Sequence, residues 1–375
     1  MFNLWYSHNM RLAVQLQLQP TPEQADLLKQ TLEAANAACN QISQVAWDLR
    51  SFKQFDIHRL TYHDIREQTG LSAQLVVRCI AKVADGYKLD KQTQRVFKPL
   101  GAVAFDERIL SYKQSSVSIW TVGGRQTIPF VCGPRQRELL DRRVGESDLA
   151  CVKGRWYLIP TAEVEEPSPI DVEGVLGIDL GIANIATDSD GETHTGAVVE
   201  RIRKRRTGRR AAGQAVGTKS AKRRLKQLAG RQRRFQANEN HRISKQVVAK
   251  AKHTKRAIAL EELSGIRTRV RVRGTEQRAR HSNWAFSQLR LFISYKAKLR
   301  GVPVEMIDPA YTSRTCAVCG CQDKCNRKTQ ALFCCISCGH SAPADWNAAV
   351  NIRERAAVNQ PMASNLRIEA QAHEL

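Results

Sequence analysis

The feature of this sequence that most constrains its fold is a pair of cysteine knuckles near the carboxyl end. Cys316 and Cys319 form one C-x2-C pair, Cys335 and Cys338 form a second, and 15 residues separate the two pairs. This spacing is typical of a zinc ribbon, in which four thiolates complete a tetrahedron around one Zn2+ ion. Because the protein supplies all four ligands, we expect a structural zinc and not a catalytic one. Residues 311–340 would then fold around the metal as a small unit.

Three cysteines of the same region stay outside this ligand set: Cys321, Cys325 and Cys334. A set that used Cys321 or Cys334 would break the two-residue spacing, and it remains the alternative. His340 could bind the metal only by displacing a cysteine, so it is left out of the ligand set. In a reducing compartment a cluster this tight favours a metal site over disulfides.

The charge balance indicates a polyanionic partner. The chain has 59 Lys and Arg but only 36 Asp and Glu, which gives a net charge of +23. Residues 201–235 alone hold 15 basic residues and no acidic one, and leucines at helical spacing predict a basic helix pair there. A solvated, poorly ordered basic segment is the plainer interpretation, and it too would bind phosphates without sequence specificity. Nucleic acid is therefore the expected partner.

Length and hydropathy exclude several classes of protein. The 375 residues are too many for one ordinary core and predict two or three domains. No run of 18 apolar residues occurs, which excludes a membrane-spanning helix and a membrane partner. Residues 1–10 lack a basic stretch followed by an apolar one, so we expect a cytoplasmic protein and not a secreted one.

The first hundred residues combine a strand pattern with a long helical pattern. Residues 10–20 alternate apolar and polar side chains, which predicts a strand. Thr21 and Pro22, with Gln24 at the third helical position, form a capping-box start for a helical stretch over residues 21–98. The apolar residues that follow are three or four positions apart: Leu28, Leu32, Ala35, Cys39, Ile42 and Ala46.

Residues 100–162 change to a strand pattern. Two β-hairpins are predicted, each with a glycine-containing turn between its runs: 116–120 with 126–130, and 149–152 with 156–159. Together with residues 1–20 they would form a small β-barrel. Trp120 and Trp156 could stack on bases there, although a core role is the more common one. The Pro-containing stretch 165–169 predicts a linker.

Three carboxylates lie where a buried charge would need a partner or a metal. Alternation along an apolar strand places Asp179 on the side of Gly177, away from the large apolar residues. It places Glu261 likewise on the side of Ala259. In both strands the small residue leaves room beside the acid. Asp345 begins a helix whose apolar side faces the sheet, so its side chain points toward the sheet as well.

Three inward carboxylates can hold two divalent cations about 3.5–4 Å apart, an arrangement that suits phosphodiester hydrolysis. Mg2+ is the expected ion, and Mn2+ is its substitute. Each acid alone has a plainer interpretation: Asp345 as a helix N-cap, Asp179 as a strand end, and Glu261 as the partner of an arginine. Glu262 is the alternative to Glu261 as the third acid of the site. Alternation along the strand would place Glu262 on the apolar face of the sheet. We interpret Glu262 as an exposed acid at the strand end.

The order of elements after the linker predicts an α/β domain with a mixed sheet. Three strands open it, at 175–181, 182–187 and 193–199. Later strands return through helices, at 257–262 and 302–307. The helix between them, residues 283–300, is expected to present one apolar face: Leu289, Phe292, Tyr295 and Leu299.

These pieces resemble TnpB, the family of insertion-sequence-encoded, RNA-guided DNA nucleases related to the type V CRISPR effectors. The family's RuvC-like nuclease motifs are similar to GIDLGIANIAT (177–187), IALEEL (258–263) and ADWNAAVNI (344–352). Its zinc ribbon is similar to YTSRTCAVCG (311–320) with FCCISCGH (333–340). Other matches are PTPEQADLL (20–28), KGRWYL (153–158) and NHRISKQVV (240–248), so that the resemblance spans nearly the whole chain.

The resemblance implies an α/β RNase H-like (RuvC) nuclease domain with an inserted zinc ribbon. It also implies an N-terminal, wedge-like β-barrel that carries an inserted helical recognition domain. The implied division is the barrel at 1–20 and 99–166, the helical insertion at 21–98, the nuclease at 170–310 and 341–358, the zinc ribbon at 311–340, and a disordered tail at 359–375.

Carried over position by position, the family's catalytic acids fall on Asp179, Glu261 and Asp345, which would bind Mg2+. Its zinc ligands fall on the four cysteines of the two knuckles. The implied partners are a guide RNA and a target double-stranded DNA with a short motif beside the target. The protein would act as one monomer per guide RNA or as a dimer, near the nucleoid of a prokaryotic cell.

The chain departs from the family pattern in two places. Glu262 stands where Asp is commoner, which does not touch the catalytic position. Pro343 stands where a second acid is common before Asp345, which loosens the expectation for the metal site. The three extra cysteines have no role in the family that we can assign.

Three other functions stay open at this point. A nuclease-inactive, RNA-guided DNA-binding repressor is disfavoured by the intact set of acids. A small type V CRISPR effector would perform the same chemistry in another genomic setting, and the sequence does not separate it from TnpB. A classical DDE transposase would use the same metals but would leave the guide-dependent half without a role.

Overall fold

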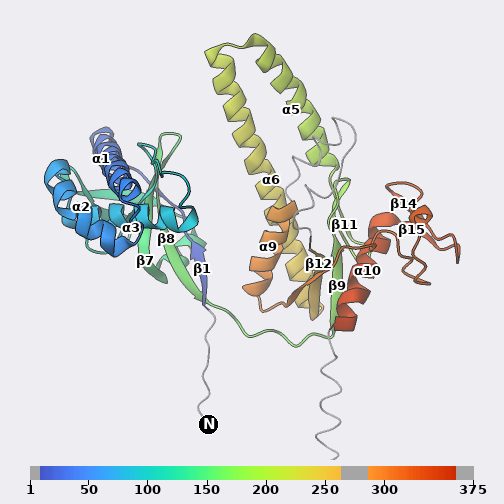
Figure 1. Ribbon diagram of the computed structural model, residues 1–375. Coiled ribbons are helices and arrows are strands. Elements are labelled where there is room, and N and C mark those ends of the chain that lie inside the picture. Colours follow the sequence, from blue (N-terminus) through green and yellow to red (C-terminus); the bar gives the residue numbers. More distant parts are fainter. Residues whose placement is uncertain (1–8, 263–285, 360–375) are drawn as a thin grey trace, which may run out of the picture. The chain divides into compact units, whose positions relative to one another are not determined.

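The computed structural model describes residues 9–262 and 286–359 (Figure 1). Its contacts divide the chain into two compact units, Met1–Glu165 and Glu166–Leu375, and the division falls inside the predicted linker 165–169. The predicted tail lies outside the described residues except for its first residue. The predicted start of the helix at 283–300 lies outside them as well.

Three helices of the first unit follow one another without a strand between them: α1 (Pro22–Asp48), α2 (Gln54–Thr69) and α3 (Ala73–Leu89). The predicted capping box is present at the start of α1, where the Thr21 hydroxyl accepts from Gln24 N–H and the Gln24 side chain accepts from Thr21 N–H. All six residues of the predicted apolar face of α1 are buried. The helical stretch ends earlier than expected, because residues 90–98 run as loop and pack their backbone on Asn40 and Ser43 of α1.

The strands of the first unit form one antiparallel sheet in the order β3-β7-β8-β2-β6-β5-β4, and β1 also pairs with β8. They are β1 (Asn9–Ala13), β2 (Leu16–Leu18), β3 (Val103–Phe105), β4 (Leu110–Tyr112), β5 (Ser116–Thr121), β6 (Gly124–Val131), β7 (Arg143–Val152) and β8 (Arg155–Glu165); a short helix, α4 (Pro134–Leu140), follows β6. Both predicted hairpins are present. The Tyr112 hydroxyl of β4 lies 2.7 Å from the Ser147 hydroxyl of β7. No strand pairing joins β3 to β4 among the described residues, so closure into a barrel stays a prediction.

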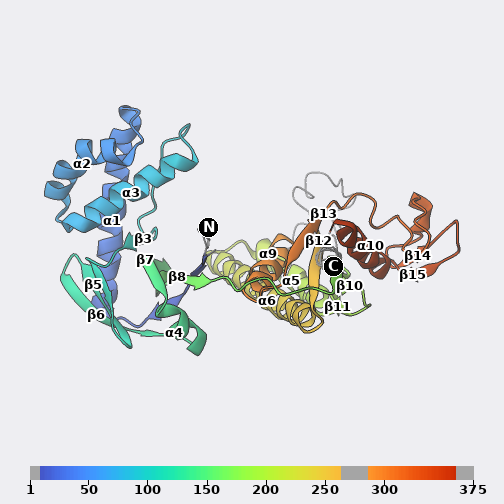
Figure 2. The same ribbon diagram turned by 90° about the horizontal axis from the view of Figure 1, so that it is seen from below.

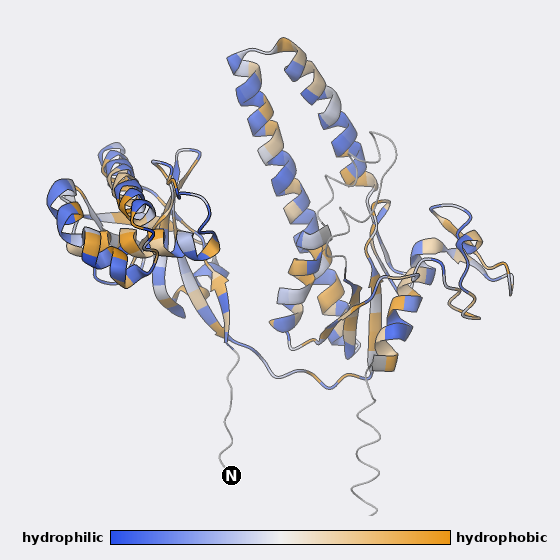
Figure 3. Ribbon diagram, viewed as in Figure 1, coloured by the Kyte–Doolittle hydropathy of each residue, from blue (hydrophilic) through white to orange (hydrophobic). Residues whose placement is uncertain are grey.

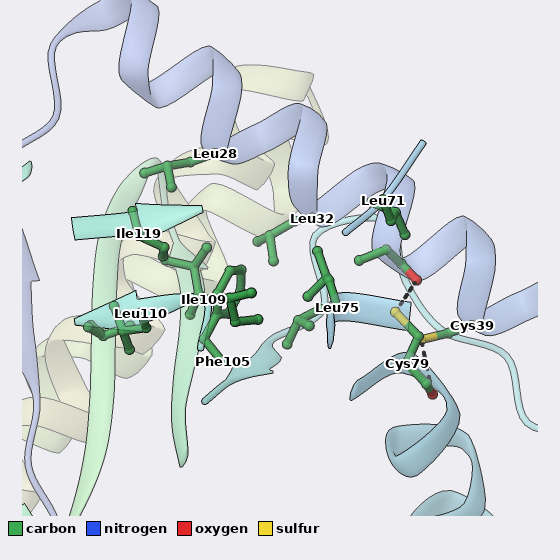
Figure 4. Packing of buried hydrophobic residues seen from close by; sticks show 14 of the residues in the cluster. Leu28, Leu32, Cys39, Leu71, Leu75, Cys79, Phe105, Ile109, Leu110 and Ile119 are labelled. Atoms are coloured by element: carbon green, nitrogen blue, oxygen red, sulfur yellow. Dashed lines mark hydrogen bonds between the residues drawn. The ribbon is translucent and has the colours of Figure 1, made fainter. Parts of the chain in front are cut away.

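Helices and sheet of the first unit share one hydrophobic core. Figure 4 shows Leu28 and Leu32 of α1 directed toward the strand residues Phe105 and Ile119. Trp156 is only 6% exposed and belongs to this core, while Trp120 packs against it. The core role expected for these two tryptophans is therefore confirmed.

The second unit is built on a five-stranded mixed sheet in the order β11-β10-β9-β12-β13. Its strands are β9 (Gly174–Asp179), β10 (Asn184–Asp188), β11 (Thr193–Thr195), β12 (Arg256–Glu261) and β13 (Val304–Ile307). The first three are antiparallel neighbours, and β12 runs parallel to both β9 and β13. The mixed α/β sheet predicted from the order of elements is thus present. The strand expected at 193–199 ends at Thr195, because helix α5 begins at Ala197.

Helices cover the two faces of this sheet differently (Figure 2). On one face lie α9 (Phe286–Lys298) and the end of α6 (Lys219–His253), packed on Leu176, Ile178 and Leu260. On the other face lies α10 (Ala344–Asn359), packed on Val175, Ala257 and Ala259. The residues of α9 that bury are Leu289, Ile293 and Ala297. The predicted face of this helix was therefore wrong beyond Leu289, since Phe292, Tyr295 and Leu299 are only partly buried.

The basic segment forms the predicted helix pair, α5 (Ala197–Val216) and α6. No residue of α5 is buried, and the buried residues of α6 begin only at Asn240. The ribbon in Figure 3 is coloured as hydrophilic over much of both helices of this hairpin, with hydrophobic residues between. The zinc-ribbon region contributes a short 3-10 turn (Lys324–Asn326) and the two-stranded sheet β14 (Leu332–Cys334) with β15 (Ser341–Pro343). Among the described helices, none is long and apolar enough to cross a membrane.

Candidate functional site

The carboxyl ends of two parallel strands bring Asp179 and Glu261 together. Ile178 of β9 pairs with Leu260 of β12, so that the next residues, Asp179 and Glu261, lie side by side where both strands end. Both acids lie on the sheet face that packs against α10, as the alternation predicts, because their strand neighbours Val175, Ala257 and Ala259 all pack there. The two acids are 82 positions apart in the chain, and the whole α5–α6 hairpin lies between them.

Asp345 reaches the same sheet edge from the first turn of α10. A Cβ atom built on Gly177 would lie 2.1 Å from the Ala349 carbonyl oxygen, so glycine is what allows α10 to lie directly on β9. The room predicted beside Asp179 is thus occupied by the backbone of α10. Asp345 Oδ2 lies 3.9 Å from a Cβ position on Gly181, two residues beyond Asp179. The structure therefore brings together all three acids that the sequence singles out.

Burial disfavours ionisation of both strand acids, and repulsion by the neighbouring carboxylates adds to this at Asp179. Burial raises the pKa of Asp179 well above its ordinary range, and the negative charges of Glu261 and Asp345 raise it further. Burial also raises the pKa of Glu261, although the Thr312 hydroxyl and the charges of Arg355 and Arg327 oppose the rise. A set of acids that repel one another in a partly dehydrated site is stabilised by a bound cation.

The carboxylate oxygens of the three acids are widely spaced. Among the described residues, one group of three or more potential metal ligands has all its ligand atoms within 4.8 Å of one another, and that group is the cysteine cluster. The ligand atoms of the three carboxylates are therefore more widely spaced. Carboxylate oxygens are the ligands that Mg2+ prefers, and Mg2+ usually keeps several waters and phosphate oxygens in addition. An open carboxylate set therefore fits Mg2+ better than a closed cage would.

The plainer interpretations of the single acids find little support. Asp345 lies inside the first turn of α10, where its Oδ2 accepts from Asn184 Nδ2 at 2.9 Å. No ion pair to Glu261 occurs within the described parts of the chain. Glu262 pairs with Arg290 of α9, on the opposite face of the sheet. The rival acid is therefore held away from Asp179 and Asp345, and its side chain is 45% exposed.

Three residues around the acids were missed by the sequence analysis: Asn184, Thr312 and Arg327. Asn184 holds Asp345, and the Thr312 hydroxyl donates to Glu261 Oε1. Arg327, from the zinc-ribbon region, lies 3.8 Å from Asp345 Oδ1. Asn184 is part of the GIDLGIAN motif and could have been singled out there. Thr312 and Arg327 lie in loops, where no periodic sequence pattern marks them as functional residues.

The four predicted zinc ligands form one cluster. Their sulfur atoms all lie within 4.8 Å of one another, with Cys316 Sγ 3.7 Å from Cys338 Sγ and Cys319 Sγ 3.5 Å from Cys335 Sγ. Cys321, Cys325 and Cys334 are not members of this cluster. Backbone N–H groups of Cys338 and Ser337 lower the pKa of Cys335 to about 6, whereas the neighbouring thiols and burial raise the pKa of Cys338 to about 12, so the cluster favours the thiolate at Cys335 first. Four soft thiolates in this arrangement fit a structural Zn2+.

The α5–α6 hairpin carries a groove near its tip, with a volume of about 700 Å3. Arginines from both helices line it, among them Arg209, Arg224 and Arg231, beside the apolar Leu225 and Leu228. This surface has the positive charge that phosphate groups require.

This chain is similar to known proteins both in sequence and in fold. Residues 286–352 match the family described as Cas12f1-like, TNB domain. The CRISPR-associated endodeoxyribonuclease Cas12f1 of Sulfoacidibacillus thermotolerans is 34% identical over 218 residues, which are 53% of this chain and 50% of that protein. The TnpB-like protein MJ0751 of Methanocaldococcus jannaschii is 34% identical over 128 residues, which are 34% of this chain and 45% of that protein. The chain thus spans about half the length of these relatives.

A solved structure has the same fold. The cryo-EM structure of a Cas12f1–sgRNA–target DNA complex matches with a TM-score of 0.61 at 14% identity, covering 89% of this chain and 83% of that one. The family match at 286–352 includes α9, the four clustered cysteines and Asp345. The resemblance inferred from the motifs is therefore confirmed: the chain carries a Cas12f1-like TNB domain and is a relative of the Cas12f1 and TnpB-like proteins.

Proposed function

We propose that this protein is an RNA-guided DNA endonuclease of the TnpB and Cas12f type, which hydrolyses phosphodiester bonds at Asp179, Glu261 and Asp345. The observation that carries the proposal is the meeting of Asp179 and Glu261 at adjacent strand ends, with Asp345 at the start of the helix that packs on the same strands. The relatives named above include an endodeoxyribonuclease, which agrees with this chemistry.

The three carboxylates are the groups that would hold Mg2+. When bound, Mg2+ polarises phosphate oxygens and makes water a stronger nucleophile at neutral pH. The Thr312 hydroxyl donates to Glu261 and the Asn184 amide donates to Asp345, and each bond restrains the orientation of its carboxylate. Arg327 lies 3.8 Å from Asp345 Oδ1, and it is placed to contact a phosphate held between the acids.

The proposed partners are a guide RNA and a complementary double-stranded DNA. In guided effectors, base pairing selects the target while the protein contacts backbone, duplex shape and a short adjacent motif. The net charge of +23 and the arginine-lined hairpin support such backbone contacts. One acid site would cut both strands in turn, by one monomer per guide RNA or by one subunit of a dimer.

We also propose the finer division of the chain. The sheet of the first unit would be the wedge-like barrel, with α1–α3 as the recognition insertion. The sheet of the second unit would be the RuvC-like nuclease, with the zinc ribbon at 311–340 inserted before α10. Both TnpB-like and Cas12f1 relatives support this assignment equally, so the genomic setting is the remaining distinction. Sequencing of the RNA that copurifies with the protein separates an insertion-element guide from a CRISPR guide.

A plasmid-cleavage assay with the copurified RNA and Mg2+ tests the site. Asp179→Ala and Glu261→Gln should each reduce cleavage by more than about 100-fold, the upper range for loss of an outer hydrogen bond to a metal ligand. Binding of guide RNA and DNA should stay intact. Glu262→Gln is the matched control, because it removes the neighbouring carboxylate that faces α9.

Three outcomes would contradict the proposal. Undiminished Mg2+-dependent cleavage by Asp179→Ala would refute the site. Guide-dependent DNA binding by the wild-type protein without any nicking would favour the nuclease-inactive repressor. Joining of DNA ends in place of hydrolysis would favour a transposase.

A further inference from the structure

A short loop connects the acid site to the zinc cluster. After β13 ends at Ile307, the chain passes Thr312 and reaches the first zinc ligand at Cys316. Thr312 is 2% exposed, an unusual degree of burial for a hydroxyl in a loop. A buried hydroxyl needs a hydrogen-bond partner, and the identity of that partner indicates what the residue does.

The partner of Thr312 is Glu261. The Thr312 hydroxyl donates to Glu261 Oε1, and its second neighbour is the Pro309 carbonyl oxygen at 3.1 Å. A hydroxyl has one proton to donate, and the shorter contact is the one to the acid. With Oε1 held by this bond, the carboxylate has one fixed orientation, and Oε2 is the oxygen left for another ligand.

Two asparagines of α10 hold the loop in place. Asn351 Nδ2 donates to the Thr312 carbonyl at 2.8 Å and to the Thr315 carbonyl at 2.7 Å. Asn347 Nδ2 donates to the Thr315 carbonyl at 2.8 Å, and its Oδ1 accepts from Ala317 N–H at 3.0 Å. These bonds grip the loop on both sides of Cys316. Asn347 is fully buried and Asn351 is 7% exposed, so the bonds are shielded from water.

The same helix carries Asp345 two residues before Asn347. One helix therefore supplies an acid directly and fixes a second acid through the loop. We propose that Thr312 is a positioning residue for Glu261, and that Asn347 and Asn351 keep it there by clamping residues 312–317 onto α10. This inference rests on the proposed function, because it assigns Thr312 a role toward a metal-binding acid.

The pair Thr312→Val and Thr312→Ser tests the role of the hydroxyl. Valine keeps the shape of threonine but has no proton to donate, whereas serine keeps the hydroxyl. Loss of an outer hydrogen bond to a metal-binding carboxylate weakens metal binding or activity by about 10–100-fold. Thr312→Val should show a loss of this size, and Thr312→Ser should stay within about threefold of the wild type.

Mn2+ binding by the full-length protein is the first readout, measured by electron paramagnetic resonance of the free ion. The second readout is the Mg2+ concentration that gives half-maximal plasmid cleavage. Thr312→Val should raise both midpoints and should need more metal to reach a given rate. Zinc content, measured by mass spectrometry of the digested protein, should remain one ion per chain in both variants.

Asp179→Asn separates failure of this inference from failure of the proposed function. If Asp179→Asn loses Mn2+ binding while Thr312→Val binds Mn2+ as the wild type does, the inference is overturned and the acid site stands. If wild type and Asp179→Asn bind Mn2+ equally, the proposed metal site itself is wrong.

Asn351→Ala tests the clamp. It should weaken Mn2+ binding in the same direction as Thr312→Val while the zinc content stays at one ion per chain, because no zinc ligand changes. Unchanged Mn2+ binding by Asn351→Ala would overturn the clamp. The melting temperature of each variant, measured alongside, identifies a variant that fails to fold. For such a variant Asn351→Ser, which keeps a short polar side chain, takes its place in the same measurement.

Discussion

At the scale of single residues, the proposed site is defined by charges that the fold holds together at a cost. The pKa of Asp179 is raised by burial first and by Glu261 and Asp345 second. Between the ordinary pKa of 3.8 and the raised one, the folded protein binds more protons than the unfolded chain. Stability of the metal-free protein therefore falls as the pH rises through that window. Sites of this kind commonly sacrifice stability for activity.

Asp179→Asn should stabilise the metal-free protein at neutral pH, because it removes a carboxylate that is forced to ionise beside two others. A gain of 1 kcal/mol would raise the Tm by about 2–4 °C for a chain unit of this size. The gain should shrink toward about pH 4, where the wild-type acid is protonated in the folded state. Calorimetry over a pH series measures this, and a lower Tm at neutral pH would contradict it.

Residues at the site were predictable to different degrees. Asp179 and Glu261 could be assigned to one sheet face because side chains alternate strictly along a strand. Asp345 followed from helical spacing, and the zinc ligands followed from their two-residue intervals. Thr312 and Arg327 could not be found in this way, since a loop has no period and their partners are 51 and 18 residues distant.

At the scale of elements, the decisive contact is the one between α10 and β9. It brings Asp345 to the strand ends, and it depends on Gly177, where any side chain would meet the Ala349 carbonyl. The sequence predicted both elements but not this close approach. The predicted buried face of α9 was also wrong, because several sets of apolar residues on this helix have the same spacing and only packing decides among them. On α9 the aromatic residues lie at the edge of the buried face, and Phe292 stacks on His241 of α6 at 3.9 Å between ring centroids.

Gly177→Ala should displace α10 and destabilise the second unit by about 1–3 kcal/mol or more, as overpacking does. Gly208→Ala in α5 is the matched control, because no atom lies within 4 Å of its Cβ position. In a helix interior alanine is favoured over glycine by about 1 kcal/mol, so the control should be neutral or stabilising. Urea unfolding of both variants measures this difference. Equal stability of the two variants would contradict the conclusion that Gly177 is needed for the close packing of α10 on β9.

At the scale of the whole molecule, positive charge dominates. The excess of 23 positive charges is far from that of an ordinary globular protein of this length, and a long hairpin carries much of it away from the hydrophobic cores. The sequence predicted the charge and the helix pair. It did not predict the arginine-lined groove between the two helices, because the facing of α5 on α6 depends on the turn between them.

Substitution of Arg209, Arg224 and Arg231 by glutamine should weaken nucleic-acid binding and reduce its dependence on salt. Each lost phosphate contact lowers the slope of log affinity against log salt by about 0.7–0.9. The matched control removes three cations that pair with nearby acids: Lys29 within α1, Lys88 within α3, and Arg142, which lies just after α4 and pairs with Glu138 of that helix. Fluorescence anisotropy with the copurified RNA measures both slopes. Equal slopes for the two triple variants would contradict a binding role for the groove.

The anchoring of the α5–α6 hairpin has a consequence for how this protein can vary in length. Its free part leaves the sheet after β11 and returns to it only in the last turns of α6, with Asn240 as the first buried residue. Shortening both helices by whole turns would therefore leave β9 and β12 paired as they are. The length of this hairpin can therefore change, by evolution or by engineering, while the register between the two strands that carry the acids stays the same.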